Sequence, residues 1–136
     1  MSGFGGDVRF AGYAAIFDRV DRGGDLVRRG AFGAVPAAGI ALLWQHRPGA
    51  AIGTVERVEE DARGLRVIGR VSARTAAGRE AAAALKAGAL DGLSFGYRVK
   101  AARGARPREL LALELVEVSL VTHPMQTLAR VHAVEG

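Results

Sequence analysis

The chain of 136 residues contains no cysteine, which excludes disulfides, zinc–thiolate sites and thiol nucleophiles. Aromatic residues make up only 6% of the chain and are not interleaved with the arginines, as base-stacking surfaces require. No stretch approaches the roughly 20 uninterrupted apolar residues of a membrane span. The N-terminus opens with glycines and Asp7 instead of a basic segment followed by an apolar one, so we expect no secretory leader. These absences favour a cytoplasmic protein that is not bound to a membrane.

What is present fits one globular domain over residues 1–136: 49% of the residues are hydrophobic, 24% are charged, and repeats and low-complexity linkers are missing. The net charge is +5, and lysine occurs only at Lys86 and Lys100, so nearly all basic residues are arginines. Because these arginines are scattered along the chain, they do not favour nucleic-acid binding as the main function. A basic nucleic-acid-binding module is kept as an alternative.

Apolar stretches punctuated by turn residues predict a mainly β chain. Val8–Phe17 reads as a strand that Gly12 bends or bulges. Residues 51–60 and 64–72 alternate apolar and polar side chains around a short turn, which is the pattern of a β-hairpin. Further strands are expected over 40–44, 93–100, 110–121 and 129–134, and a short helical turn is expected around Ala31–Val35.

The segment Ala76–Ala87 is the one clear helix. It is rich in alanine, Thr75 precedes it as an N-cap, and Gly88 follows it as a residue suited to the left-handed conformation at a helix end. About seven strands with one or two helices predict an α+β domain, mainly β, built as a small barrel or sandwich with helices outside it.

Three polar residues lie in apolar or glycine-rich surroundings. His46 ends an apolar strand, Ser94 lies between two glycines directly after the helix, and Glu117 lies inside an apolar strand. Each has a structural explanation of its own: a surface histidine, a turn serine, or a carboxylate on the wet face of an edge strand. Together they match serine hydrolase chemistry, in which a histidine activates the hydroxyl and a carboxylate orients the imidazole.

Segments spread along the chain resemble the prohead maturation proteases of tailed phages, which are related to the herpesvirus capsid protease (assemblin). The order and spacing of these segments carry the resemblance; they are residues 12–18, 24–32, 43–46, 52–53, 64–67, 85–97 and 117–124. The resemblance implies a closed, assemblin-like β-barrel of about seven strands with flanking helices. It also implies a serine endopeptidase inside the immature capsid, the prohead, that cleaves scaffold or the N-terminal extension of the major capsid protein and then degrades itself or leaves.

The resemblance assigns roles to the three residues. Ser94 would be the nucleophile and His46 the general base. The phage branch carries an acidic third member, here Glu117, whereas the herpesvirus relatives use a second histidine. His123 and His132 therefore stay open as alternatives for the third position, with Glu117 preferred.

Further expectations concern the surroundings of this site. The backbone at Phe95 and Gly96, together with Arg130, is expected to help bind the oxyanion, and neither a metal nor a cofactor is implied. The expected partners are the major capsid protein or scaffold as substrate, and a homodimer by analogy with the herpesvirus enzymes. The composition suits a prophage or a gene transfer agent, a domesticated phage-like particle. The alternative function is an inactive capsid-assembly module that keeps the fold.

Overall fold

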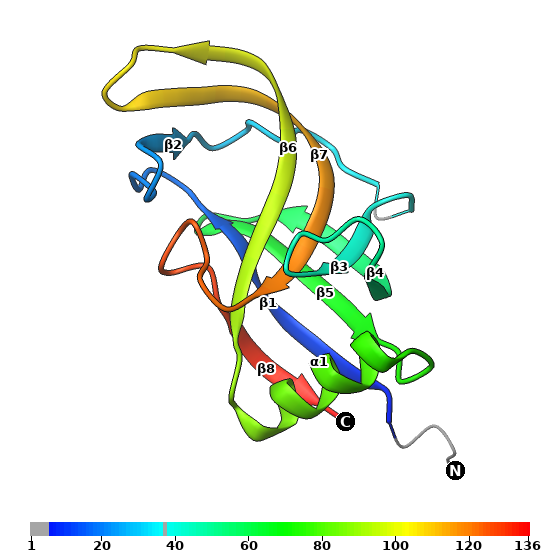
Figure 1. Ribbon diagram of the computed structural model, residues 1–136. Coiled ribbons are helices and arrows are strands. Elements are labelled where there is room, and N and C mark those ends of the chain that lie inside the picture. Colours follow the sequence, from blue (N-terminus) through cyan, green and yellow to red (C-terminus); the bar gives the residue numbers. More distant parts are fainter. Residues whose placement is uncertain (1–5, 37) are drawn as a thin grey trace.

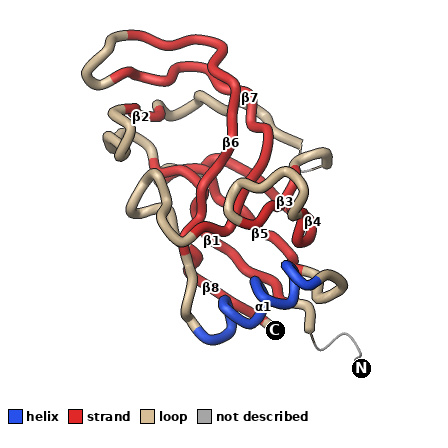
Figure 2. Tube along the Cα trace, viewed as in Figure 1, coloured by secondary structure: helices blue, strands red, loops and turns tan. Residues whose placement is uncertain are grey.

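The protein is an eight-stranded sheet with one helix in the described part of the chain, residues 6–36 and 38–136 of a computed structural model (Figures 1 and 2). The first five residues, which bear on the expectation of no leader, lie outside the described residues. The elements in chain order are β1 (Val8–Ile16), β2 (Asp25–Val27), β3 (Ala41–Trp44), β4 (Ala51–Glu60), β5 (Gly64–Val71), α1 (Ala76–Ala87), β6 (Gly92–Arg103), β7 (Arg108–Val121) and β8 (Val131–Glu135).

The N-terminal half of the sheet follows the sequence pattern closely. β4 and β5 form the predicted antiparallel hairpin, and β1 pairs with β5 on its other edge. The predicted irregularity of β1 is confirmed, because its register shifts between Ala11 and Gly12 against β8 and between Tyr13 and Ala15 against β5. These shifts bend the strand and help the sheet to curl.

The strand β7 is the central strand of the other half of the sheet. One of its edges pairs in parallel with β2 and β3, and the other pairs antiparallel with β6 along the length of both strands. A parallel neighbour must come from a distant part of the chain. The pairing of β3 with β7 therefore brings residues 41–44 beside residues 117–120.

The sheet curls without closing into a complete barrel. In the described residues, β6 and β8 meet through one isolated bridge, Gly92 with Arg130, flanked by backbone hydrogen bonds from Leu93 N to Ala129 O and from Val131 N to Asp91 O. Gly12 lies at this junction, where a Cβ would come 2.5 Å from Arg130 O and 2.7 Å from Leu93 Cδ1. The curled, mainly β architecture was predicted, but the closed barrel is not confirmed.

The helix α1 has the predicted bounds and the predicted caps. Thr75 Oγ1 accepts a hydrogen bond from Gly78 N at 3.0 Å, and Gly88 adopts φ +69°, in the left-handed region. Ala81, Ala82 and Leu85 bury one side of the helix in the same core that the strands enclose. No helix among the described residues is long and apolar enough to cross a membrane.

The segment between β2 and β3 differs from its prediction. The helical turn expected around Ala31–Val35 is absent, and residues 31–35 form bends instead. The Glu60 carboxylate at the end of β4 accepts hydrogen bonds from the N–H groups of Gly30 and Phe32. A distant side chain therefore satisfies these backbone donors and holds the segment in its bent conformation.

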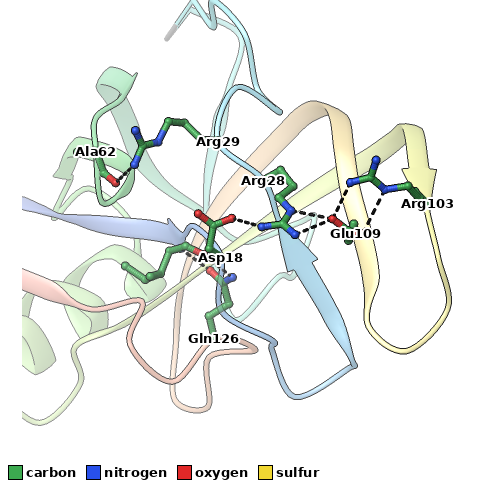
Figure 3. A network of polar contacts seen from close by, with 8 residues as sticks. Asp18, Arg28, Arg29, Ala62, Arg103, Glu109 and Gln126 are labelled. Carbon is green, nitrogen blue, oxygen red and sulfur yellow. Dashed lines mark hydrogen bonds and ion pairs between the residues drawn. The ribbon is translucent and has the colours of Figure 1, made fainter.

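Beyond Tyr97, β6 and its partner β7 extend from the curled sheet as a long arm, seen at the top of Figure 1. An ion-pair network ties this arm to the β1–β2 region (Figure 3). Glu109 on β7 binds Arg103 on β6 and Arg28 after β2, and Arg28 also binds Asp18. The two guanidinium groups lower the pKa of Glu109 to about 2.

Candidate active site

His46 lies in a tight turn directly after β3. Gln45 and His46 have φ values of +54° and +60°, a left-handed conformation that is uncommon for residues other than glycine. The Gln45 side chain holds the turn against the end of β7, because it donates to Thr122 Oγ1 at 2.6 Å and accepts from Thr122 N at 3.0 Å. The turn places the imidazole beside β7, where its Nδ1 contacts Glu117.

Glu117 lies in the middle of β7, and its carboxylate meets the His46 ring. His46 Nδ1 and Glu117 Oε1 are 2.5 Å apart, and Glu117 is only 9% exposed. The alternative of a carboxylate on a wet edge strand is wrong, because β7 is paired on both edges at this point. The contact with Glu117 uses Nδ1, so Nε2 is the ring nitrogen left for another partner.

The pKa of His46 is raised from its ordinary value, mainly by the hydrogen bond to Glu117, although partial burial opposes the shift. The pairing with a carboxylate favours the imidazolium, the form a general base adopts once it has taken a proton. The ring is nevertheless 44% exposed, so it stays within reach of a substrate.

Ser94 lies on β6, the strand next to β7, and its Cα pairs directly with that of Ser119. Directly opposed residues of an antiparallel pair share a face of the sheet, with Cβ atoms about 5 Å apart. Side chains alternate along β7, so Glu117 and Ser119 share that face as well. Phe95 lies on the opposite face, in the core, where its ring stacks on Tyr97 at 4.8 Å. Ser94, Ser119 and Glu117 are thus brought to one face, beneath the His46 turn.

Two glycines flank Ser94 on this face. Gly96 is opposite Glu117, and a Cβ at Gly96 would lie 2.5 Å from Glu117 Oε1. Gly92 lies beneath Pro124, whose Cδ would be 3.0 Å from such a Cβ. The absence of side chains at these positions leaves the room that the Glu117 carboxylate and Pro124 occupy.

The other predicted site residues lie elsewhere. The guanidinium of Arg130 binds Asp91 Oδ1 and Thr127 O, while its backbone bridges Gly92 at the start of β6. His132 is exposed on β8, with its ring 5.9 Å from that of Tyr13, and His123 is exposed after the end of β7. Of the three histidines, His46 is therefore the one that contacts Glu117.

Ser119 is a site residue that the sequence reasoning did not single out. It is completely buried, donates from Oγ to Glu117 Oε2 at 2.5 Å, and accepts from the backbone N–H of His46 at 3.2 Å. The signal available in the sequence was its spacing: it lies two residues after Glu117 in an apolar strand and hence on the same face.

Solved structures with a similar fold include two viral proteases. The varicella-zoster virus protease superposes with a TM-score of 0.59 at 19% identity, over 95% of this chain and 64% of that one. The KSHV protease, solved in complex with a hexapeptide phosphonate inhibitor, superposes with a TM-score of 0.62 at 11% identity, over 96% of this chain and 65% of that one. At these identities the similarity shows an assemblin-like fold.

Sequence comparison gives the family. The prohead protease of Enterobacteria phage HK97 is 29% identical over 103 residues, which cover 73% of this chain and 46% of the phage protein. The chain thus spans less than half the length of this curated relative. The family profile described as caudovirus prohead serine protease matches residues 3–136. The chain therefore belongs to the caudovirus prohead serine protease family.

Proposed function

We propose that this chain is a serine endopeptidase that cleaves scaffold or the N-terminal extension of the major capsid protein inside the assembling prohead. Ser94 is the nucleophile, His46 the general base and Glu117 the residue that orients the imidazole. The observation that carries the proposal is the 2.5 Å contact between His46 Nδ1 and Glu117 Oε1, on the sheet face to which Ser94 belongs. Family membership supports the same assignment.

The proposed mechanism follows from these positions. Ser94 Oγ attacks the scissile carbonyl carbon while its proton passes to His46 Nε2. Glu117 stabilises the resulting imidazolium through Nδ1–H. His46 then returns the proton to the leaving amine, which leaves an acyl-enzyme on Ser94. A water molecule activated by the same imidazole hydrolyses the acyl-enzyme and restores the serine.

Beyond Leu93, the edge of β6 away from β7 pairs with no other strand among the described residues and offers a place for the substrate backbone. Leu93 N donates to Ala129 O on the side away from β7. Because N–H groups alternate along a strand, the Phe95 N–H points to the same side, at the free edge one residue beyond the nucleophile. The Gly96 N–H points toward β7 by the same alternation, so Phe95 is the better-placed oxyanion donor of the two. An extended substrate would pair with this edge as an added strand.

Co-expression with the full-length major capsid protein of the same locus tests the proposal. We expect trimmed capsid protein with the wild type, an untrimmed product with Ser94→Ala, and trimming again with Ser72→Ala, a matched serine substitution in the turn after β5. Intact masses of the products identify the cleaved bond. An untrimmed capsid protein with all three, bound to a folded protease domain, would support the inactive assembly module instead.

A further inference from the structure

Ser119 closes a ring of hydrogen bonds around the proposed His46–Glu117 pair. The two oxygens of the Glu117 carboxylate have different partners: Oε1 meets the His46 ring and Oε2 accepts from Ser119 Oγ. The same Ser119 oxygen accepts the backbone N–H of His46. The hydroxyl thus links the backbone of the histidine to the carboxylate that holds its ring.

This ring fixes groups that would otherwise rotate. A carboxylate bound through one oxygen can turn about its last torsion, which is a broad and weakly restrained one. Binding at Oε2 removes that freedom, because Ser119 is 0% exposed and projects from the paired core of the sheet. The hydrogen bond to His46 N also supports a backbone conformation, φ +60°, that is costly for a side chain with a Cβ.

We propose that Ser119 is a positioning residue of the active site, one that aligns the Glu117 carboxylate with the His46 imidazole through a single buried hydroxyl. Ser119 touches neither the substrate nor the reacting atoms, and it acts through its two neighbours. The inference rests on the proposed function for its catalytic meaning, but the alignment itself is a property of the folded chain.

The alignment has a consequence that is measurable without any substrate. Glu117 is the group that raises the pKa of His46, through the hydrogen bond to its ring and through its charge. If Ser119 holds the carboxylate in place, Ser119→Ala loosens this contact and the pKa of His46 falls toward its ordinary value. Because the chain has three histidines, ¹⁵N-histidine NMR with His123→Gln and His132→Gln variants assigns the His46 titration.

The matched control is Ser72→Ala. Ser72 Oγ likewise accepts a backbone N–H, from Arg74 at 3.3 Å, but Ser72 follows β5 and its hydrogen bonds are to Arg74 and Ile52 rather than to His46 or Glu117. We expect Ser72→Ala to leave the His46 titration unchanged, and Ser119→Thr, which keeps the hydroxyl, to restore it. A His46 pKa in Ser119→Ala that equals or exceeds the wild-type value would overturn the proposal.

A second readout separates this inference from the proposed function. The rate at which a fluorophosphonate probe labels Ser94, followed by intact mass, should fall about 10- to 100-fold in Ser119→Ala, by analogy with the loss of a hydrogen-bond partner that orients a metal-bound histidine or carboxylate. If the wild type is not labelled, the proposed function fails while the NMR titration still decides the role of Ser119. Labelling of Ser119→Ala at the wild-type rate would contradict the positioning role.

Discussion

Gly96 lies directly opposite Glu117 in the β6–β7 ladder, and the carboxylate occupies the space that a side chain at residue 96 would need. The glycine two residues after the proposed nucleophile is therefore explained by the carboxylate rather than by a turn. From the sequence, the backbone at Gly96 was expected to help bind the oxyanion. The structure gives it a steric role in the pairing of Glu117 with His46.

Gly96→Ala should abolish fluorophosphonate labelling of Ser94 while the protein still folds. The added methyl would lie 2.5 Å from Glu117 Oε1, so the carboxylate must move away from the imidazole. We expect a stability loss of about 1–3 kcal/mol, the usual cost of overpacking, measured by urea unfolding. Gly23→Ala is the control, because a Cβ there meets no atom closer than 3.4 Å and both properties should be retained. Normal labelling of Gly96→Ala would show that the carboxylate position is not required.

The labelling rate of Ser94 should rise with pH through a pKa above the ordinary 6.5 of histidine, because the proposed base is neutral His46 and Glu117 favours its charged form. In Glu117→Gln the charge is removed, so this acidic limb should move to lower pH while the maximal rate falls. The measurement is a pH profile of labelling for both proteins. If the acidic limb of the profile stays at the same pH in Glu117→Gln, Glu117 does not set the pKa of the group that activates Ser94.

The same pairing affects stability with the opposite pH dependence. A histidine whose folded pKa is raised stabilises the folded state at low pH, below its unfolded value. This contribution is lost as pH rises through the folded pKa. The half-exposed ring keeps the effect small. Thermal unfolding of wild type and Glu117→Gln should differ more at pH 6 than at pH 9, and an equal difference at both would contradict the pairing.

Acid should loosen the arm before the rest of the sheet unfolds. The pKa of Glu109 is lowered to about 2 by Arg103 and Arg28, so its contribution is present above the ordinary value of 4.5 and is lost as pH falls toward 2. The protection factors of the amides in residues 98–112, each corrected for the intrinsic exchange rate at the pH used, should be lower at pH 3 than at pH 5 in the wild type. Glu109→Gln should show low protection at both values, and a wild-type pattern in this variant would exclude the network as the cause.

Gly12→Ala should separate β8 from the start of β6. A Cβ at residue 12 would lie 2.5 Å from Arg130 O and 2.8 Å from Val131 Cα, both in the segment that completes the curl of the sheet. We expect a loss of about 1–3 kcal/mol in urea unfolding and faster hydrogen exchange in residues 131–135. A variant as stable as the wild type would mean that β8 adjusts without cost.

Local signals predicted the elements whose partners are close in the chain. The helix 76–87 carries its own caps at Thr75 and Gly88, and the β4–β5 hairpin has its turn between the two strands. The strand β2 was missed because three residues carry no periodicity, and only pairing with residues 108–110 makes them a strand. The bends at 31–35 depend on the distant Glu60 carboxylate, which no local pattern reveals.

The candidate site was likewise predictable only where the signal is local. His46, Ser94 and Glu117 could be singled out because each is a polar residue within or at the end of an apolar or glycine-rich segment of the sequence. The left-handed turn at Gln45–His46 could not, because it depends on Thr122 and Ser119, which are held in place by the distant strand β7. Apart from its spacing from Glu117, nothing in the sequence distinguishes Ser119 from other small residues in strands. Its role becomes visible only from the pairing of β7 with β3 and β6.

The parallel pairing of β3 with β7 also bears on when the proposed site can form during synthesis. His46 and Glu117 are 71 residues apart, with the three strands β4, β5 and β6 and the helix α1 between them. A nascent chain that has only just released the His46 turn from the ribosome has no carboxylate to orient the imidazole, and the Ser94 strand lacks its partner. The proposed site is completed only when residues 117–120 emerge, so synthesis itself delays the proposed proteolysis until β7 is available.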